Sequence, residues 1–301
     1  MIDLIGDIHG HADKLKQLLS KLGYTDNNGV YQHPERKVIF VGDYIDRGPQ
    51  VRETLRIVRS MVEADQAIAL MGNHEYNAIC FHYEEREGGH LRKHLIKNIL
   101  QHYETLKQFQ NLHDEYNDYI DWFKTLPLYY ETDALRVVHA CWDKLNINFL
   151  RQHLDNDRLN DALIHESAKV GSPLYCAIEE TLKGKEVALP NGATFQDKDG
   201  NVRTEIRIKW WEDPARMTYR QLSIEPSDSI PEEPVGEALS NATYYQDAKP
   251  VFFGHYWLKG TPQLQGSNIC CLDYSVAKGG HLVAYRFDGE GVLERGKLVV
   301  V

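Results

Sequence analysis

Basic residues do not outnumber acidic residues in this sequence, and this lack argues against two broad functions. The 301 residues include 34 Lys and Arg against 44 Asp and Glu, so the formal net charge at pH 7 is −10. General nucleic-acid binders and membrane-surface binders both need an excess of positive charge. We therefore expect neither partner, although the acidic total still allows one small cationic pocket.

Cysteines and long apolar runs are also scarce. The five cysteines are odd in number and scattered, unlike the dense pairs of a secreted disulfide framework. No apolar run approaches the about 20 residues that a membrane-spanning helix needs. The opening MIDLIGDIHG contains neither a basic leader nor an apolar signal core. These absences predict reduced thiols and a cytoplasmic protein.

The residues that are present predict a folded α/β protein. Hydrophobic residues make up 42% of the chain and charged residues 26%, which is typical of a globular protein. Helical spacing at 15–22 and 55–62 alternates with the first apolar runs. Strands are predicted at 2–6, 37–43, 67–73, 134–140, 250–257, 268–275 and 281–287. In such layered folds, ligands bind at the carboxyl ends of the strands.

Two segments depart from this pattern. Residues 76–125 are charged, aromatic and rich in helix formers, with roughly helical spacing of Leu91, Leu95, Ile99 and Leu106. Residues 145–245 have weaker periodicity, and a hairpin is predicted at 190–203, around Asp199-Gly200. We interpret 1–301 as a single domain with a helical insertion at about 76–125 and a lid-like insertion at about 145–245.

Side chains that can bind metals follow several of the predicted strands. They are Asp7, His9, Asp43, Asn73, His139 and His255. All but His139 adjoin a glycine, which permits a tight loop around an ion. Mixed oxygen and nitrogen ligands with one shared carboxylate suit two divalent ions such as Mn, Fe or Zn. After subtraction of two aspartates and a bridging hydroxide, two such ions leave about one positive charge, which attracts a phosphate.

The same residues lie in five short segments: GDIHG (6–10), GDYIDRG (42–48), GNHE (72–75), VVHA (137–140) and FGHYW (253–257). In this order the segments resemble the calcineurin-like metallophosphoesterase superfamily. Within it they are similar to the phosphoprotein phosphatase branch, which includes bacterial symmetrical dinucleoside-tetraphosphate hydrolases. The resemblance implies an α/β sandwich of two mixed sheets, flanked by helices and carrying helical and hairpin insertions. It also implies a hydrolase that cleaves phosphoesters by attack of a metal-bound hydroxide.

The resemblance further implies roles for single residues. Asp7, His9 and Asp43 would hold one metal, and Asp43 would bridge to a second. Asn73, His139 and His255 would complete that second site, and Asn73 would also contact substrate. His74 would protonate the leaving-group oxygen, Asp46 would orient His74, and Arg47 would clamp the phosphoryl oxygens. Two divalent ions are thus expected, manganese first, with Fe, Zn, Ni or Co as alternatives.

The substrate is less closely defined than the reaction. Met71 before GNHE and Ala140 after His139 depart from family protein phosphatases, and CLDYSVAKGGHLVAYR (271–286) is more similar to the tail of the dinucleotide hydrolases. The leading expectation is hydrolysis of a phosphomonoester, on a phosphoprotein or a nucleotide. The alternatives are a symmetrical dinucleoside-polyphosphate hydrolase and a non-enzymatic phosphate-binding scaffold.

The segment IRIKWWEDP (206–214) allows two interpretations. It is either a half-buried strand that packs Trp210 and Trp211 on the core, or a lid with a cationic edge and a stacking surface for the substrate. On the second interpretation, Arg207, Trp210 and Trp211 bind substrate. A second phosphate-binding arginine is not assigned by the motifs, and the candidates are Arg203, Arg207 and Arg216.

Overall fold

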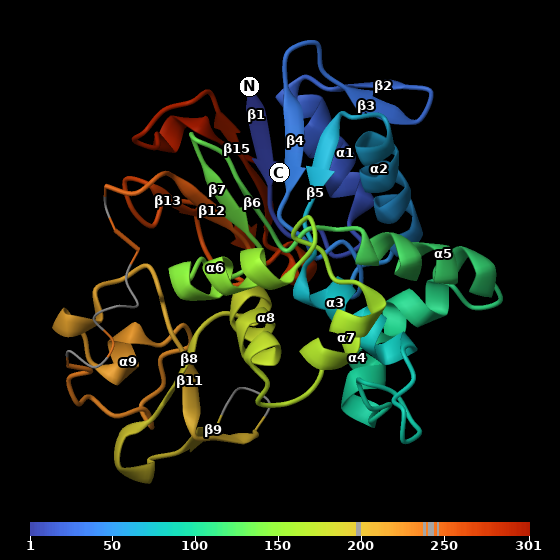
Figure 1. Ribbon diagram of the computed structural model, residues 1–301. Coiled ribbons are helices and arrows are strands. Elements are labelled where there is room, and N and C mark those ends of the chain that lie inside the picture. The colour runs from blue at the N-terminus through green and yellow to red at the C-terminus, as the bar shows by residue number, and fades with distance from the viewer. Residues whose placement is uncertain (197–199, 237–238, 240–243, 246) are drawn as a thin grey trace.

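The apolar runs of the sequence form two mixed β-sheets that pack face to face (Figure 1). The computed structural model describes residues 1–196, 200–236, 239, 244–245 and 247–301. The first sheet contains β1 (Ile2–Ile5), β4 (Lys37–Phe40), β5 (Ala67–Ala69), β14 (Asp273–Tyr274), β15 (His281–Phe287) and β16 (Leu298–Val300). Its order is β14-β15-β1-β4-β5, with β16 paired to β15. β1, β4 and β5 run parallel, and β15 is antiparallel to β1.

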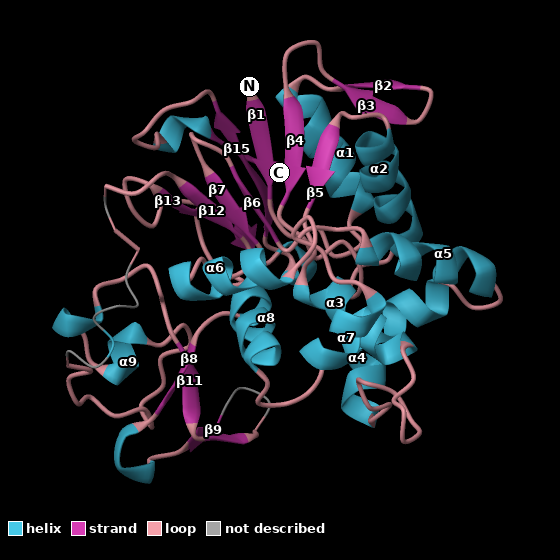
Figure 2. Ribbon diagram, in the orientation of Figure 1, coloured by secondary structure: helices cyan, strands magenta, loops and turns pink. Residues whose placement is uncertain are grey.

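The second sheet has the order β13-β12-β7-β6. Its strands are β6 (Tyr129–Glu131), β7 (Arg136–Val138), β12 (Val251–Phe253) and β13 (Ile269–Cys271). β7, β12 and β13 run parallel, and β6 is antiparallel to β7. The parallel strands of both sheets therefore deliver their carboxyl ends to the same region of the molecule, where loops converge (Figure 2).

Alternation along the strands places one set of side chains between the sheets and the other against the helices. Leu4 and Ile39 join Phe252 in a buried cluster between the two sheets. Their neighbours Ile5 and Phe40 instead belong to a second cluster that the helices cover. Both faces of the parallel strands are thus buried, as expected for strands read from continuous apolar runs.

Helices cover the outer faces of this sandwich (Figure 1). They are α1 (Ala12–Leu22), α2 (Val51–Glu63), α3 (Asn73–His82), α4 (Ile96–Gln108), α5 (His113–Lys124), α6 (Lys144–His153), α7 (Asp161–Ser167), α8 (Pro173–Lys183) and α9 (Tyr219–Leu222). In α1, Leu15, Leu18 and Leu22 form the buried stripe that the spacing predicts, and Gly23 ends the helix in left-handed backbone. Among the described residues, no helix is both long and apolar enough to cross a bilayer.

The segment predicted to be helical contains α4 and α5, but the spacing misidentifies the buried face of α4. Leu95 and Ile99 are exposed, whereas His102 and Thr105 are buried. The reason is that α4 packs polar side chains against a buried carboxylate rather than an apolar stripe against the core. Whether 1–301 is one domain stays a prediction.

The segment 145–245 contains α6 to α9 and two small strand pairs. β8 (Glu186–Ala188) pairs with β11 (Glu205–Arg207), and β9 (Phe195–Gln196) pairs with β10 (Val202–Arg203). The β9–β10 pair matches the predicted hairpin, although Asp199 lies outside the described residues. A separate apolar cluster around Ile206 and Leu222 supports this segment. Near the N-terminus, a further antiparallel pair joins β2 (Thr25–Asn27) to β3 (Val30–Gln32). The cysteines are all free thiols.

Candidate metal centre and substrate pocket

The predicted metal ligands all lie just beyond the carboxyl ends of strands. Asp7 and His9 follow β1, Asp43 follows β4, His139 follows β7 and His255 follows β12. Asn73 begins α3, directly after the loop from β5. All six side chains are buried. Because the parallel strands end together, these loops meet although their residues are up to 248 positions apart in sequence.

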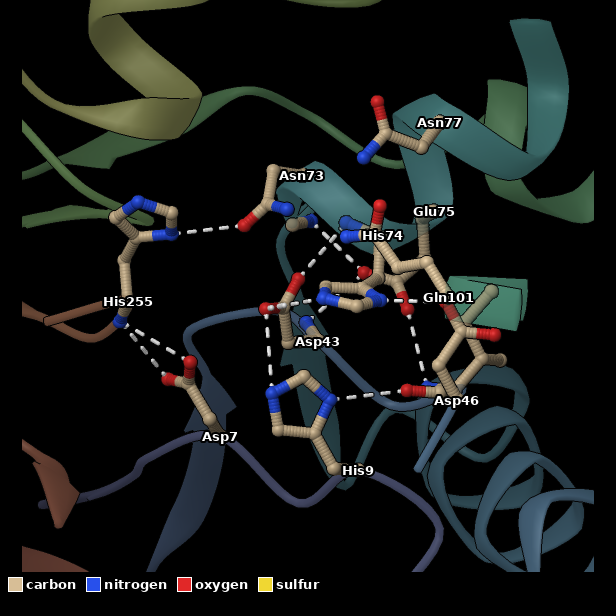
Figure 3. Close-up of polar contacts among 12 residues, drawn as sticks. Asp7, His9, Asp43, Asp46, Asn73, His74, Glu75, Asn77, Gln101 and His255 are labelled. Carbon is tan, nitrogen blue, oxygen red and sulfur yellow. Dashed lines mark hydrogen bonds and ion pairs between the residues drawn. The ribbon is translucent and has the colours of Figure 1, made fainter. Parts of the chain in front are cut away.

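Two groups of ligand atoms share Asp43. His9, Asp43 and His74 form one group, and Asp43, His139 and His255 form the other, with the ligand atoms of each group within 4.8 Å of one another. Asp43 Oδ2 lies 3.5 Å from His9 Nε2, and Asp43 Oδ1 lies 3.4 Å from His139 Nε2. The predicted shared carboxylate therefore lies between the two groups, with one oxygen directed at each (Figure 3).

Asn73 and Asp7 extend the two groups. Asn73 Oδ1 lies 3.0 Å from His139 Nε2 and 2.8 Å from His255 Nδ1, so three predicted ligands of the second metal converge. Asp7 accepts the backbone N–H of His255 at 3.0 Å. His74, which we predict to be a catalytic residue rather than a ligand, also stands in the first group.

Backbone carbonyls fix the orientation of two of the histidine rings. His9 Nδ1 lies 3.0 Å from Ile45 O, and His139 Nδ1 lies 2.9 Å from Val41 O. A carbonyl can only accept, so each Nδ1 carries the hydrogen and each Nε2 faces Asp43 as a potential ligand. This donor set of imidazole nitrogens, carboxylates and one amide oxygen fits first-row divalent ions.

Burial and the neighbouring carboxylates shift the pKa values of the two histidines in opposite directions. Burial lowers the pKa of His9 to about 3, so this ring is neutral and free to bind a metal. Burial also opposes the charged form of His139, but the carboxylates of Asp43 and Asp7 outweigh it and raise its pKa to about 10. In the metal-free protein, a proton on His139 therefore occupies the position that a cation would take.

Glu75 of α3 holds the loop that carries Asp43. Its fully buried carboxylate accepts backbone N–H groups of Gly72, Asp43 and Tyr44 at 2.8 to 3.0 Å. The loop and the helix approach so closely that a Cβ on Gly72 would lie 2.3 Å from Asp43 Oδ1. Glycine at this position is therefore required for the ligand to stand where it does.

Left-handed backbone is concentrated around the site. Residues other than glycine with positive φ include His9 (46°), Asp43 (57°), Asp46 (67°), Arg47 (67°), His255 (71°) and Trp257 (35°). Such conformations cost roughly 1–3 kcal/mol each, and they persist where the surrounding structure enforces them. Their gathering at one place marks it as a functional site.

The three predicted catalytic side chains also meet here. His74 Nδ1 lies 2.5 Å from Asp46 Oδ2, and both side chains are buried. Burial alone would raise the pKa of Asp46, but hydrogen bonds and charge from His102 and His74 hold it well below its ordinary value. The carboxylate is therefore ionised and able to orient His74. Arg47, which is exposed, lines the pocket in front of this pair.

A pocket of about 400 Å³ opens over the two ligand groups. Its lining includes six cationic side chains: Arg47, Arg92, Lys183, Arg203, Arg207 and Lys278. Arg207 also contacts His255, with Nη1 3.1 Å from Nε2. Of the arginines that the sequence left open, Arg203 and Arg207 line the pocket and Arg216 does not. Cationic side chains thus gather at this pocket although the whole chain is acidic, and three of them also have glutamate partners: Arg203 and Arg207 face Glu186, and Lys183 faces Glu179.

Trp210 and Trp211 do not line this pocket. Both are buried, and both rings pack near Phe253, while Trp210 donates its indole N–H to Ala140 O at 3.0 Å. The two tryptophans lie in a turn just beyond β11 and pack on the core, which favours the first interpretation of this segment over a stacking surface for the substrate. Trp257, two residues beyond His255, lines the pocket instead, with Arg207 and Lys278 each 5.8 Å from its ring.

Sequence reasoning missed several residues that complete the site. Glu75 is the last residue of GNHE, and Trp257 is the last residue of FGHYW, so the motifs contained both residues but assigned them no role. Arg92 and Lys183 come from segments without a recognisable pattern, and Lys278 lies in the quoted tail 271–286, which gave it no role. Only the folded chain brings them to the pocket.

Comparisons with known proteins identify the family of the chain. The chain matches the family of calcineurin-like phosphoesterases over residues 1–256 and belongs to that family. This match confirms the predicted family, and the two mixed sheets confirm the predicted fold class. The family consists of phosphoesterases, which are hydrolases, in agreement with the predicted enzyme class.

Two relatives bear names that specify a nucleotide substrate. A symmetrical bis(5'-nucleosyl)-tetraphosphatase of Marinomonas sp. is 25% identical over 299 residues, covering 95% of this chain and 94% of that protein. An asymmetrical bis(5'-nucleosyl)-tetraphosphatase PrpE of Oceanobacillus iheyensis is 34% identical over 141 residues, or 46% of this chain. That match spans about half of the relative's length, 54%. A solved protein serine/threonine phosphatase of Saccharomyces cerevisiae aligns with 100% of this chain and 78% of its own, with 15% identity and a TM-score of 0.49.

Proposed function

We propose that this chain is a dinuclear-metal phosphohydrolase whose substrate is a nucleotide with several linked phosphates, such as a dinucleoside polyphosphate. The observation that carries the proposal is the set of six cations around one pocket above two groups of metal ligands. A phosphomonoester offers about two negative charges, which two divalent ions and one arginine already balance. The remaining cations suit a longer anionic chain.

The aromatic part of the pocket supports a nucleotide rather than inorganic polyphosphate. Trp257 is partly buried beside His255, with ring centroids 5.6 Å apart. Its indole offers a planar face on which a base can stack. The names of the two tetraphosphatase relatives point in the same direction.

Each residue then has a chemical task. Asp7, His9, Asp43, Asn73, His139 and His255 hold the metals, for which we propose manganese. Two bound divalent ions lower the pKa of a water molecule and polarise the phosphoryl oxygens. Arg47 orients the reacting phosphoryl group through paired N–H donors. His74 gives its Nε2 proton to the leaving oxygen while Asp46 holds its other nitrogen.

A substrate panel tests the proposal. Manganese-loaded protein should hydrolyse diadenosine tetraphosphate with a kcat/KM at least about 100-fold above that for a phosphopeptide, because the flanking phosphates reach the additional cations. Two ADP as products would indicate symmetrical cleavage, and ATP with AMP asymmetrical cleavage. Preference for the phosphopeptide would contradict the proposal and favour the phosphoprotein alternative.

A single variant separates an enzyme from a phosphate-binding scaffold. Replacing His74 by Asn removes the proposed acid, so turnover should fall by about 100-fold or more while both metals stay bound. Equal rates in the variant would favour the scaffold. The free thiols accord with the predicted cytoplasmic location, which stays a prediction.

A further inference from the structure

Asp46 serves more than His74, because its two carboxylate oxygens have different partners. Oδ2 accepts from His74 Nδ1 at 2.5 Å. Oδ1 faces α4, where His102 Nδ1 and Thr105 Oγ1 each lie 2.6 Å away. Thr105 Oγ1 also accepts the backbone N–H of Asp46 at 3.0 Å. The helix thus holds both the side chain and the main chain of Asp46.

The hydrogen-bond chain continues beyond His102. Its Nε2 lies 2.6 Å from the hydroxyl of Tyr116 on α5. An ionised carboxylate can only accept, so Nδ1 of His102 donates to Asp46. Burial, with the charge of Asp46, raises the pKa of Tyr116, so its hydroxyl keeps its proton and ends the chain of hydrogen bonds.

Burying these polar groups costs free energy that their hydrogen bonds to one another must offset. His102, Thr105 and Asp46 are 5%, 0% and 2% exposed, so they contact one another in place of water. A fully satisfied buried network fixes its members more firmly than a single hydrogen bond does. It is also the reason that α4 has a polar buried face, which amphipathic spacing does not predict.

We propose that His102 and Thr105 are positioning residues that lock Asp46 and, through it, aim Nε2 of His74 at the leaving-group oxygen. This inference rests on the proposed function, since it gives His74 the role of proton donor. As the oxygen of a hydroxide forms its bond to phosphorus, the bond to the leaving oxygen breaks, and that oxygen takes the proton from His74 Nε2, which solvent then replaces. His102 and Thr105 exchange nothing with the substrate.

The dependence of the rate on the leaving group tests this role. A poor leaving group needs the proton and a good one does not, so misaiming His74 should affect only the former. His102→Ala should lower kcat for phenyl phosphate by about 10- to 100-fold and for 2,4-dinitrophenyl phosphate by less than about threefold. His102→Asn should recover much of the loss, because its amide N–H approximates Nδ1. His102→Gln, whose amide lies nearer to the Nε2 position, should recover less.

A matched control lies eight residues away on the same segment. His94 stacks on Phe81 with ring centroids 3.8 Å apart, and its Nε2 lies 2.8 Å from Phe81 O rather than at Asp46, so His94→Ala should leave both substrates unaffected. Metal content measured on each variant separates misaiming from metal loss. Equal losses for both leaving groups, or no loss for either, would overturn the inference.

Proton NMR with labelled histidine gives a second readout that does not depend on activity. Wild-type protein should show downfield ring N–H resonances for His74 and His102. His102→Ala should shift or broaden the His74 resonance, and His94→Ala should leave it in place. An unchanged His74 resonance in His102→Ala would also overturn the inference. If the wild-type protein hydrolyses none of the substrates, the proposed function fails, whereas a perturbed His74 resonance would still support the brace on Asp46.

Discussion

The strand-end loops and the two surrounding segments contribute to one pocket in different ways. The loops supply buried ligands whose atoms lie within 4.8 Å of one another. The surrounding segments supply cations such as Arg92, Lys183 and Arg203, which are partly or fully exposed. A metal site demands fixed geometry, whereas a charge needs only to come near its counterion. From this difference we expect the loops to determine the reaction and the segments to select the substrate.

The largest effect is expected from the residue that the two ligand groups share. Asp43→Asn removes the charge that faces both groups, so activity should fall by about 1,000-fold or more and bound metal should be lost. Elemental analysis and the rate of diadenosine tetraphosphate hydrolysis would check this. Asp65→Asn is the control, because Asp65 has nearly the same left-handed backbone (55° against 57°) but an exposed side chain. Full metal content in Asp43→Asn would contradict a shared ligand.

A smaller loss of metal affinity is expected when the loop keeps Asp43 but loses the Glu75 carboxylate that holds it in place. Glu75→Gln replaces one acceptor oxygen by an N–H₂ group that would face backbone N–H groups. Each donor left unsatisfied costs about 1–3 kcal/mol, and metal affinity should fall by about 10- to 100-fold. Metal titration and thermal unfolding would measure both effects. Glu63→Gln, at an exposed position of α2, should change neither, and wild-type affinity in Glu75→Gln would refute the anchoring role.

Substitutions of Trp257, which lines the pocket, and of Trp210, which packs in the core, should have different effects. Trp257→Ala should raise the KM for diadenosine tetraphosphate by about tenfold without changing tripolyphosphate hydrolysis, because only the base loses its surface. Trp210→Phe should instead destabilise the fold by about 1–3 kcal/mol, because it removes a buried hydrogen bond and leaves space in the core. Steady-state kinetics and denaturant unfolding would compare the two. If Trp210→Phe instead raised the KM and Trp257→Ala destabilised the fold, Trp210 would be a substrate-binding residue.

The last prediction concerns the dependence of metal affinity on pH. The pKa of His139 is raised to about 10, so a metal ion must displace its proton at neutral pH. Raising the pH removes this competitor, and metal affinity should increase by up to about tenfold per unit until pH approaches that pKa. Calorimetric titration in buffers of different ionisation enthalpy would count the released protons. His153→Gln, on the exposed end of α6, should release the same number, and affinity independent of pH would contradict the assignment.

The sequence predicted the parts of the molecule in which local pattern and function coincide. The run before Asp43 is apolar because β4 is buried on both faces, and Asp43 itself follows directly, so strand and ligand could be read together. His102 could not be read in this way, because Asp46, the carboxylate that it braces, lies 56 residues away and no local period records the contact. Lys183 pairs locally with Glu179, four residues before it, and only the folded chain brings it to the pocket. Trp210 and Trp257 illustrate the same limit, since only tertiary packing decides which indole is covered.

The left-handed backbone at His9, Asp43, Asp46 and Arg47 has a consequence for laboratory evolution. Glycine adopts such torsions without strain, so a glycine there would relax the main chain and at the same time delete a working side chain. Selection for heat resistance alone should therefore favour glycine at the exposed Arg47 and yield a more stable but less active protein, whereas glycine at Asp46 would also leave its buried hydrogen-bond donors unpaired. Selection for turnover should retain the strained residues, which makes the trade-off between stability and activity local and visible in sequence.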